Sequence, residues 1–153
     1  MGQNGEESVI HWISDIDVPA ALVSYAYRTI QKSFAKELAP YHLGWGHFAI
    51  LMSLYEMEGC SQDSLALSRG FDKTMIAKSV VRLEEEGFVR RKTDNVDKRV
   101  KRLYLTKKSR NLRPEMERIG YRLNEFLFRD FDTAESASAM RILRKIALNA
   151  SEL

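Results

Sequence analysis

The chain of 153 residues contains a single cysteine, Cys60, so no disulfide can form within it. No run of about 18 apolar residues occurs, and a membrane-spanning helix is therefore not expected. The opening residues, MGQNGEES, have neither the basic nor the apolar segment of a secretory signal. Glu6 stands where a myristoylation signal needs serine or threonine. We expect a cytoplasmic protein, associated with the nucleoid if it binds DNA, with residues 1–153 forming one domain.

Patterns that carry catalysis are also missing. The sequence has no glycine-rich phosphate loop, no nucleophile with a placed base, and no pair of carboxylates arranged for acid–base work. Its 3 histidines are His11, His42 and His47, and no cysteine joins the last two to complete a tetrahedral zinc site. We therefore expect no enzyme activity, no cofactor and no resident metal ion.

Cys60 lies between Gly59 and a candidate helix cap, a place that suits a small, inward-facing strand residue. A redox-sensing thiol should instead be exposed and close to positive charge. We expect Cys60 to be inert packing, and a metal- or redox-responsive regulator remains the alternative interpretation.

The chain has little excess of either charge, since its net charge is only +3, but its basic and acidic residues are unevenly distributed along the sequence. Residues 69–113 contain 15 lysines and arginines against 6 acidic residues, whereas the rest of the chain contains 9 against 15. A basic middle between acidic ends is typical of a localised nucleic-acid surface. A solvated charged face is the alternative.

The strongest local signal is a basic β-hairpin. Two short runs with alternating apolar residues, 88–92 and 101–105, flank a polar turn. Directly before them lies a helical pattern that ends at Gly87. A helix followed by a positive hairpin fits a DNA groove and its phosphates. Residues 90–102 hold 7 basic side chains against 2 acidic ones, and the basic ones are Arg90, Arg91, Lys92, Lys98, Arg99, Lys101 and Arg102.

Two helices joined by a tight turn are predicted before the hairpin. Ser61 is placed to cap a short helix that Gly70 ends, and Asp72 is placed to cap the next one. The N-terminus of the first helix, with Ser61 and Gln62, is a candidate phosphate contact. On the second helix Ile76, Val80 and Leu83 share one face. The opposite face is a candidate for reading base edges and phosphates, with Lys73 at the helix start and Thr74, Met75, Lys78 and Arg82 along it.

Helices are also predicted on both sides of this region. Asp17 and Pro19 are placed to start one that runs to about Leu38, and a further helix covers residues 45–57. After the hairpin, Thr106 is placed to cap a long helix and Thr133 a final one. The final helix carries an apolar stripe of Ala137, Met140, Leu143, Ile146 and Ala150, which we expect to face inward.

These outer helices bear more apolar surface than one small lobe can cover, so a second copy of the chain is the economical partner. We expect residues 9–40 and 107–153 to be dimerisation helices and residues 41–106 to be the DNA-binding lobe. The conformation of residues 9–16 is left open, and residues 1–8 are expected to be unstructured. The fold class is mainly α with a small β-hairpin wing: a winged helix-turn-helix plus terminal dimerisation helices.

The motifs SQDSLA, DKTMIAKSVVRLEEEGFVRR and DKRVKRLYLT, in this order, resemble those of the MarR family of bacterial winged-helix transcription regulators. The resemblance covers about residues 18–149. It implies a homodimeric regulator, most often a repressor, that binds palindromic promoter DNA and is released by a small aromatic or phenolic effector. It also implies that Arg99 enters the minor groove from the wing tip, while Asp97 holds the wing by pairing with Arg91.

The resemblance further places an effector pocket beside the lobe, and aromatic walls suit an aromatic ligand. Ordinary core and dimer packing is the other interpretation of the same side chains, and a winged-helix module that binds proteins is the competing function. The candidate pocket residues are Tyr27, Arg28, Trp45, His47 and Phe48, with Tyr25 and Tyr41 nearby in sequence.

Overall fold

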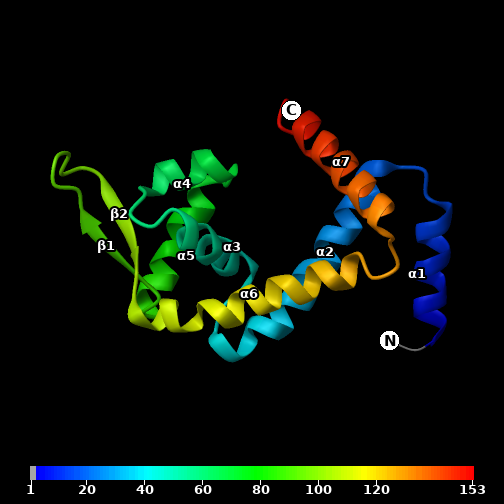
Figure 1. Ribbon diagram of the computed structural model, residues 1–153, viewed down its shortest axis with the longest axis horizontal. Coiled ribbons are helices and arrows are strands. Elements are labelled where there is room, and N and C mark those ends of the chain that lie inside the picture. Colours follow the sequence, from blue (N-terminus) through cyan, green and yellow to red (C-terminus); the bar gives the residue numbers. More distant parts are fainter. Residues whose placement is uncertain (1–2) are drawn as a thin grey trace. The chain divides into compact units, whose positions relative to one another are not determined.

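The computed structural model describes residues 3–153, and the side chains of residues 8–153 (Figure 1). The chain divides into two compact units, residues 1–113 and 114–153, with the boundary inside a helix at Pro114. The elements are α1 Gln3–Asp15, α2 Pro19–Leu38, a short 3-10 turn Ala39–Tyr41, α3 Trp45–Glu56, α4 Gln62–Arg69, α5 Lys73–Glu85, β1 Val89–Thr93, β2 Lys101–Leu105, α6 Lys107–Leu127 and α7 Thr133–Ala150.

The predicted helix-turn-helix is confirmed as α4 and α5. The Ser61 hydroxyl caps α4 by accepting the Ser64 N–H at 3.0 Å, and the Asp72 carboxylate caps α5 by accepting the Met75 N–H at 2.8 Å. Gly70 ends α4 at φ +64°, a left-handed backbone conformation that residues other than glycine rarely adopt. These local signals fix where α4 ends and where α5 starts.

The core of the first unit lies where α3, α4, α5 and the hairpin meet. The predicted inward stripe of α5 is buried there, and Phe88 anchors the start of the hairpin at 1% exposure. Burying side chains of this size stabilises each by about 1.5–3 kcal/mol relative to exposure. The core members are Leu38, Ile50, Leu51, Leu54, Leu65, Ile76, Val80, Leu83, Phe88 and Leu103.

The hairpin has the predicted antiparallel form, although its first strand begins one residue later than expected, at Val89. Val89 pairs with Leu105, and Arg91 pairs with Leu103. The outer edge of β2 is paired as well, because Leu103 accepts the Gly59 N–H at 2.8 Å and donates to the Cys60 carbonyl at 2.9 Å. The segment before α4 thus pairs with β2 through an isolated bridge, with Ser61 opposite Arg102. Figure 1 shows the β1–β2 hairpin projecting beyond α4 and α5.

Three expectations for the outer helices are wrong. Val18, not Asp17, is the N-cap of α2, because Pro19 occupies the first helical turn and the residue before it takes the cap position. Asp132, not Thr133, caps α7 through a capping box with Glu135. Residues 3–8 belong to α1 rather than to an unstructured tail, and residues 1–2 lie outside the described part.

The apolar stripe of α7 does not face inward in the single chain. No residue of α7 is buried, and Leu143 is 49% exposed. Residues 3–153 contain no helix that is both long enough and apolar enough to span a bilayer.

Candidate nucleic-acid interface

The outer face of α5 carries most of the side chains expected there. Thr74, Lys78 and Arg82 are exposed, whereas Met75 is half-buried. A Cβ atom at Gly46 of α3 would lie only 3.5 Å from Met75 Sδ, so Met75 belongs partly to the packing between α3 and α5. Lys73 Nζ lies 3.0 Å from the Asp63 carboxylate of α4. The helix therefore presents a narrower polar face than its sequence indicates.

The start of α4 and the end of the wing turn share one polar hollow. A cavity of about 270 Å³ is lined by Ser61, Gln62, Asp63, Arg99, Val100 and Lys101. Residues predicted separately as phosphate contacts and as wing contacts are thereby brought together. Backbone N–H groups at a helix start and two cations suit an anionic oxygen at this place.

The wing turn is organised by Asp94, which sequence reasoning missed as a site residue. Its carboxylate accepts the N–H groups of Val96 at 2.8 Å and Asp97 at 3.0 Å, and it forms an ion pair with Arg102. The hydrogen bond from Arg102, followed by those from the backbone, lowers the pKa of Asp94 to about 2. Because Arg102 also donates to the Gly59 carbonyl at 3.0 Å, this arginine fastens the turn to the segment before α4.

The expected brace between Asp97 and Arg91 is wrong. Arg91 Nε donates to the Glu84 carboxylate of α5 at 2.8 Å, whereas Asp97 contacts Arg99 Nε at 3.2 Å. The hydrogen bond from Arg99 lowers the pKa of Asp97. The Arg99 side chain is nevertheless 91% exposed. Its guanidinium, at the wing tip, contacts Asp97 two residues away and is otherwise open to solvent.

The remaining cations of α5 and the wing differ in how freely they can meet a phosphate. Within the described side chains, Lys78, Arg90 and Lys98 take part in no ion pair. Lys92 Nζ lies 5.2 Å from the centre of the Tyr104 ring, and Lys101 donates to the Thr93 hydroxyl at 2.7 Å. These contacts leave both ammonium groups on the surface.

The five candidate effector residues lie in different surroundings. Trp45 and Phe48 pack against Phe34, with ring centres 4.8 and 4.7 Å from it, so the core interpretation accounts for both. Tyr27 is 50% exposed, and Arg28 donates to the Ser24 hydroxyl at 2.6 Å on the same helix. The fifth, His47, accepts the Gly44 N–H at 3.0 Å and caps α3.

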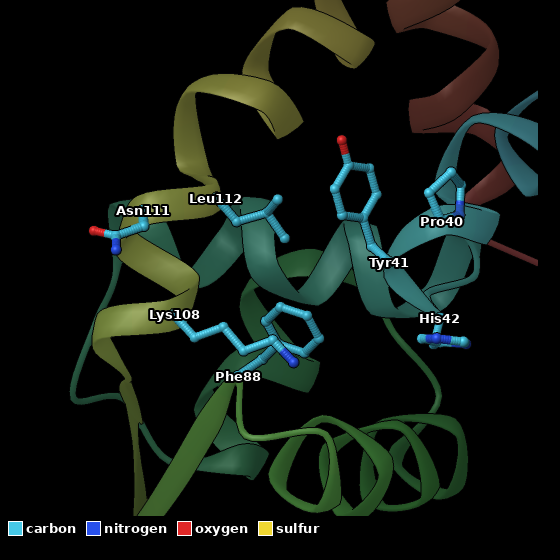
Figure 2. A pocket seen from close by; sticks show the side chains of 7 residues that line it. All are labelled: Pro40, Tyr41, His42, Phe88, Lys108, Asn111 and Leu112. Carbon is cyan, nitrogen blue, oxygen red and sulfur yellow. The ribbon is translucent and has the colours of Figure 1, made fainter.

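A cavity of about 300 Å³ lies elsewhere in the first unit, and none of those five residues lines it. Figure 2 shows Lys108 extending beside the Phe88 ring, with Tyr41 and Leu112 on the same cavity. The Lys108 ammonium lies 4.0 Å from the ring centre and donates to the Glu86 carbonyl, at the end of α5, at 2.7 Å. The full lining is Pro40, Tyr41, His42, Phe88, Lys108, Asn111 and Leu112.

His47 gives the lobe a pH dependence. Burial, followed by the nearby positive charge of Arg82, lowers the pKa of this imidazole below its usual value of 6.5. The fold therefore favours neutral His47, and its contribution to stability is present above about pH 6.5 and is lost as the pH falls below that value. We expect the wild-type protein to have a higher melting temperature than the His47→Ala variant at pH 7.5, and this difference to become smaller at pH 5. A constant gap in melting temperature would contradict this role.

Cys60 is half-buried, and burial raises the pKa of its thiol. A raised pKa disfavours the reactive thiolate, which agrees with the packing interpretation. In the part of the chain whose side chains are described, no three of His, Cys, Asp and Glu lie close enough to hold a metal ion.

Comparisons with known proteins agree with this geometry. The MarR family profile matches residues 43–101. A MarR transcriptional regulator of known structure from Methanosarcina mazei Go1 is 34% identical, with a TM-score of 0.80, and the match covers 87% of this chain and 96% of that one. The uncharacterized HTH-type transcriptional regulator YybA of Bacillus subtilis (strain 168) is 26% identical, with 90% and 89% of the two chains covered.

A putative MarR family transcriptional regulator from Listeria monocytogenes, crystallised with 26mer DNA, has the same fold, with a TM-score of 0.82 at 23% identity over 90% of this chain and 91% of that one. The relatives named here are transcription regulators rather than enzymes. With a helix-turn-helix, a basic wing and a 34% identical relative covered almost end to end, this chain belongs to the MarR family of transcription regulators.

Proposed function

We propose that the protein is a homodimeric repressor that binds palindromic promoter DNA in the cytoplasm. The observation that carries the proposal is the set of exposed cations on α5 and the wing, two of which, Arg99 and Lys101, line the hollow at the start of α4. In that set, Lys78, Arg90 and Lys98 are free of acidic partners within residues 8–153. The Listeria relative bound to 26mer DNA supports the same use of the fold. Two lobes that cover a promoter exclude polymerase sterically.

Apolar side chains left open on the outer helices support a second copy as the partner. On α7, Met140, Leu143 and Ile146 recur every three residues on one exposed face, and a protein that stays monomeric rarely leaves a large contiguous apolar patch open. A twofold dimer also gives two recognition helices the spacing of successive major grooves. The exposed residues include Ile10, Trp12, Val23, Tyr27, Phe126, Leu127, Met140, Ile142, Leu143 and Ile146.

Release by a small aromatic effector is the regulatory branch of the proposal, and the cavity beside Phe88 is its candidate site. Lys108 on that cavity already holds the carbonyl of Glu86 at the end of α5. An acidic ligand bound there would pair with this ammonium and favour dimers in which the separation of the two lobes no longer fits the operator. Measuring binding to the selected duplex in the presence of aromatic acids tests whether such ligands release the DNA.

The function is tested by the salt dependence of binding to DNA selected from a random pool. A protein with about 6–10 phosphate contacts loses a factor of about 10³–10⁵ in affinity between 50 and 200 mM salt. We expect a loss of this size, measured by fluorescence anisotropy with a labelled duplex. An affinity for the duplex that does not fall with rising salt would contradict this function and favour a winged-helix module that binds proteins.

A further inference from the structure

One side chain of the recognition helix reaches the wing. Glu84, in the last turn of α5, accepts the backbone N–H of Arg91 at 3.1 Å through Oε1 and the Arg91 Nε at 2.8 Å through Oε2. Each of the two side chains is only 35% exposed. The hydrogen bond from the Arg91 guanidinium lowers the pKa of Glu84, so the carboxylate is ionised at neutral pH.

The hairpin register explains why this N–H is available. Arg91 lies opposite Leu103, and Leu103 makes its own backbone bonds outward, to Gly59 and Cys60. In an antiparallel pair, a residue whose partner bonds outward has its own N–H on the outer edge. Glu84 therefore closes the exposed edge of β1 from the side of α5.

The position of Glu84 is costly for the helix alone. Residues 84–86 are three glutamates at the C-terminal end of α5, where the helix dipole disfavours negative charge. Two of them, Glu85 and Glu86, are met by Arg82 on the same helix, at 3.6 and 2.6 Å. Glu84 alone is directed to the wing, which indicates a role outside the helix.

We propose that Glu84 is a positioning residue that sets DNA specificity: it fixes the wing relative to α5 and holds the Arg91 guanidinium away from the phosphates. This rests on the proposed DNA-binding function. A wing in fixed register adds to binding only at the correct sequence, whereas a free arginine adds to binding anywhere.

The sign of the effect distinguishes this role from simple electrostatics. Glu84→Gln removes one negative charge, which by itself strengthens binding to every duplex. We expect binding to a scrambled duplex to stay equal or tighten, and binding to the selected duplex to weaken about tenfold, comparable to one lost base-pair contact. The measurement is the ratio of the two dissociation constants at fixed salt.

Glu85→Gln is the matched control, because it removes the same charge one residue further along and Arg82 keeps its contact with Glu86. It should leave the ratio unchanged. Arg91→Gln in the Glu84→Gln background should cancel any gain on the scrambled duplex. Amide hydrogen exchange at Arg91 reports the contact without DNA, and it should be faster in Glu84→Ala, which removes both acceptor oxygens, but not in Glu85→Ala.

The outcomes separate the two claims. If wild type prefers one duplex and Glu84→Gln keeps that preference, the positioning role is wrong while the regulator function stands. If wild type binds no duplex, both fail, although hydrogen exchange still shows whether Glu84 holds Arg91. Equal ratios for Glu84→Gln and Glu85→Gln, both below wild type, would mean that charge alone sets specificity.

Discussion

Arg99→Ala is expected to weaken binding to the selected duplex about 100-fold while leaving the fold and the dimer intact. An arginine at a groove is worth about 1–3 kcal/mol, and two wings in a dimer lose it together. The Asp97 carboxylate also accepts the backbone N–H of Arg99 at 3.0 Å, a bond that alanine keeps. The turn therefore persists, and the loss reports the guanidinium itself.

Anisotropy titrations at one salt concentration check this, with Arg129→Ala as the matched control. Arg129 is an exposed arginine of the second unit that pairs only with the neighbouring Asp130, at 3.0 Å, and stacks on Phe126. Unchanged affinity in the control beside a large loss at Arg99 supports the wing contact. Arg99→Ala protein that binds as tightly as wild type would remove Arg99 from the interface.

Leu143→Glu is expected to convert the proposed dimer to a monomer and thereby to abolish tight binding to the selected duplex. Leu143 is 49% exposed on α7, a helix with no buried residue. An unpaired charge forced into an apolar interface costs about 3–5 kcal/mol, a loss of more than about 100-fold in the dimer's association constant. Analytical ultracentrifugation over a range of concentrations measures this change.

Lys145→Glu on the same helix is the control, because position 145 lies about 200° around α7 from position 143. It should sediment as wild type does. A wild-type protein that sediments as a monomer at all concentrations would refute the dimer, and equal effects of both substitutions would indicate a loss of α7 rather than of an interface.

The positions of the lobe's helices follow from local chemistry, which is why sequence reasoning located them. Ser61, Asp72 and Gly70 act within one turn of themselves, and their roles do not depend on distant residues. The wrong prediction of the cap of α7 also depends on local chemistry. Asp132 and Thr133 are adjacent residues that both favour a cap, and the reciprocal bond to Glu135 decides between them.

The partners of the wing arginines could not be predicted in this way. Glu84 lies seven residues before Arg91 and Asp97 six residues after it, so distance along the chain does not separate them. The choice depends on which edge of β1 faces α5, and that is set by packing between elements. A count of charges also treats an acidic residue only as a loss of net positive charge. Here Glu84 fixes an arginine and one backbone N–H, and Asp94 fixes an arginine and two backbone N–H groups.

The pairing of Gly59 and Cys60 with Leu103 has a mechanical consequence. It joins the wing to the segment that leads into α4, so a movement of the wing relative to α4 would break backbone hydrogen bonds. In a dimer, an inducer would then change the distance between the two DNA-binding lobes and leave the affinity of each lobe for its own half-site unchanged. Operators with one base pair added or removed between their half-sites would therefore respond to an inducer differently, while a single half-site would not respond.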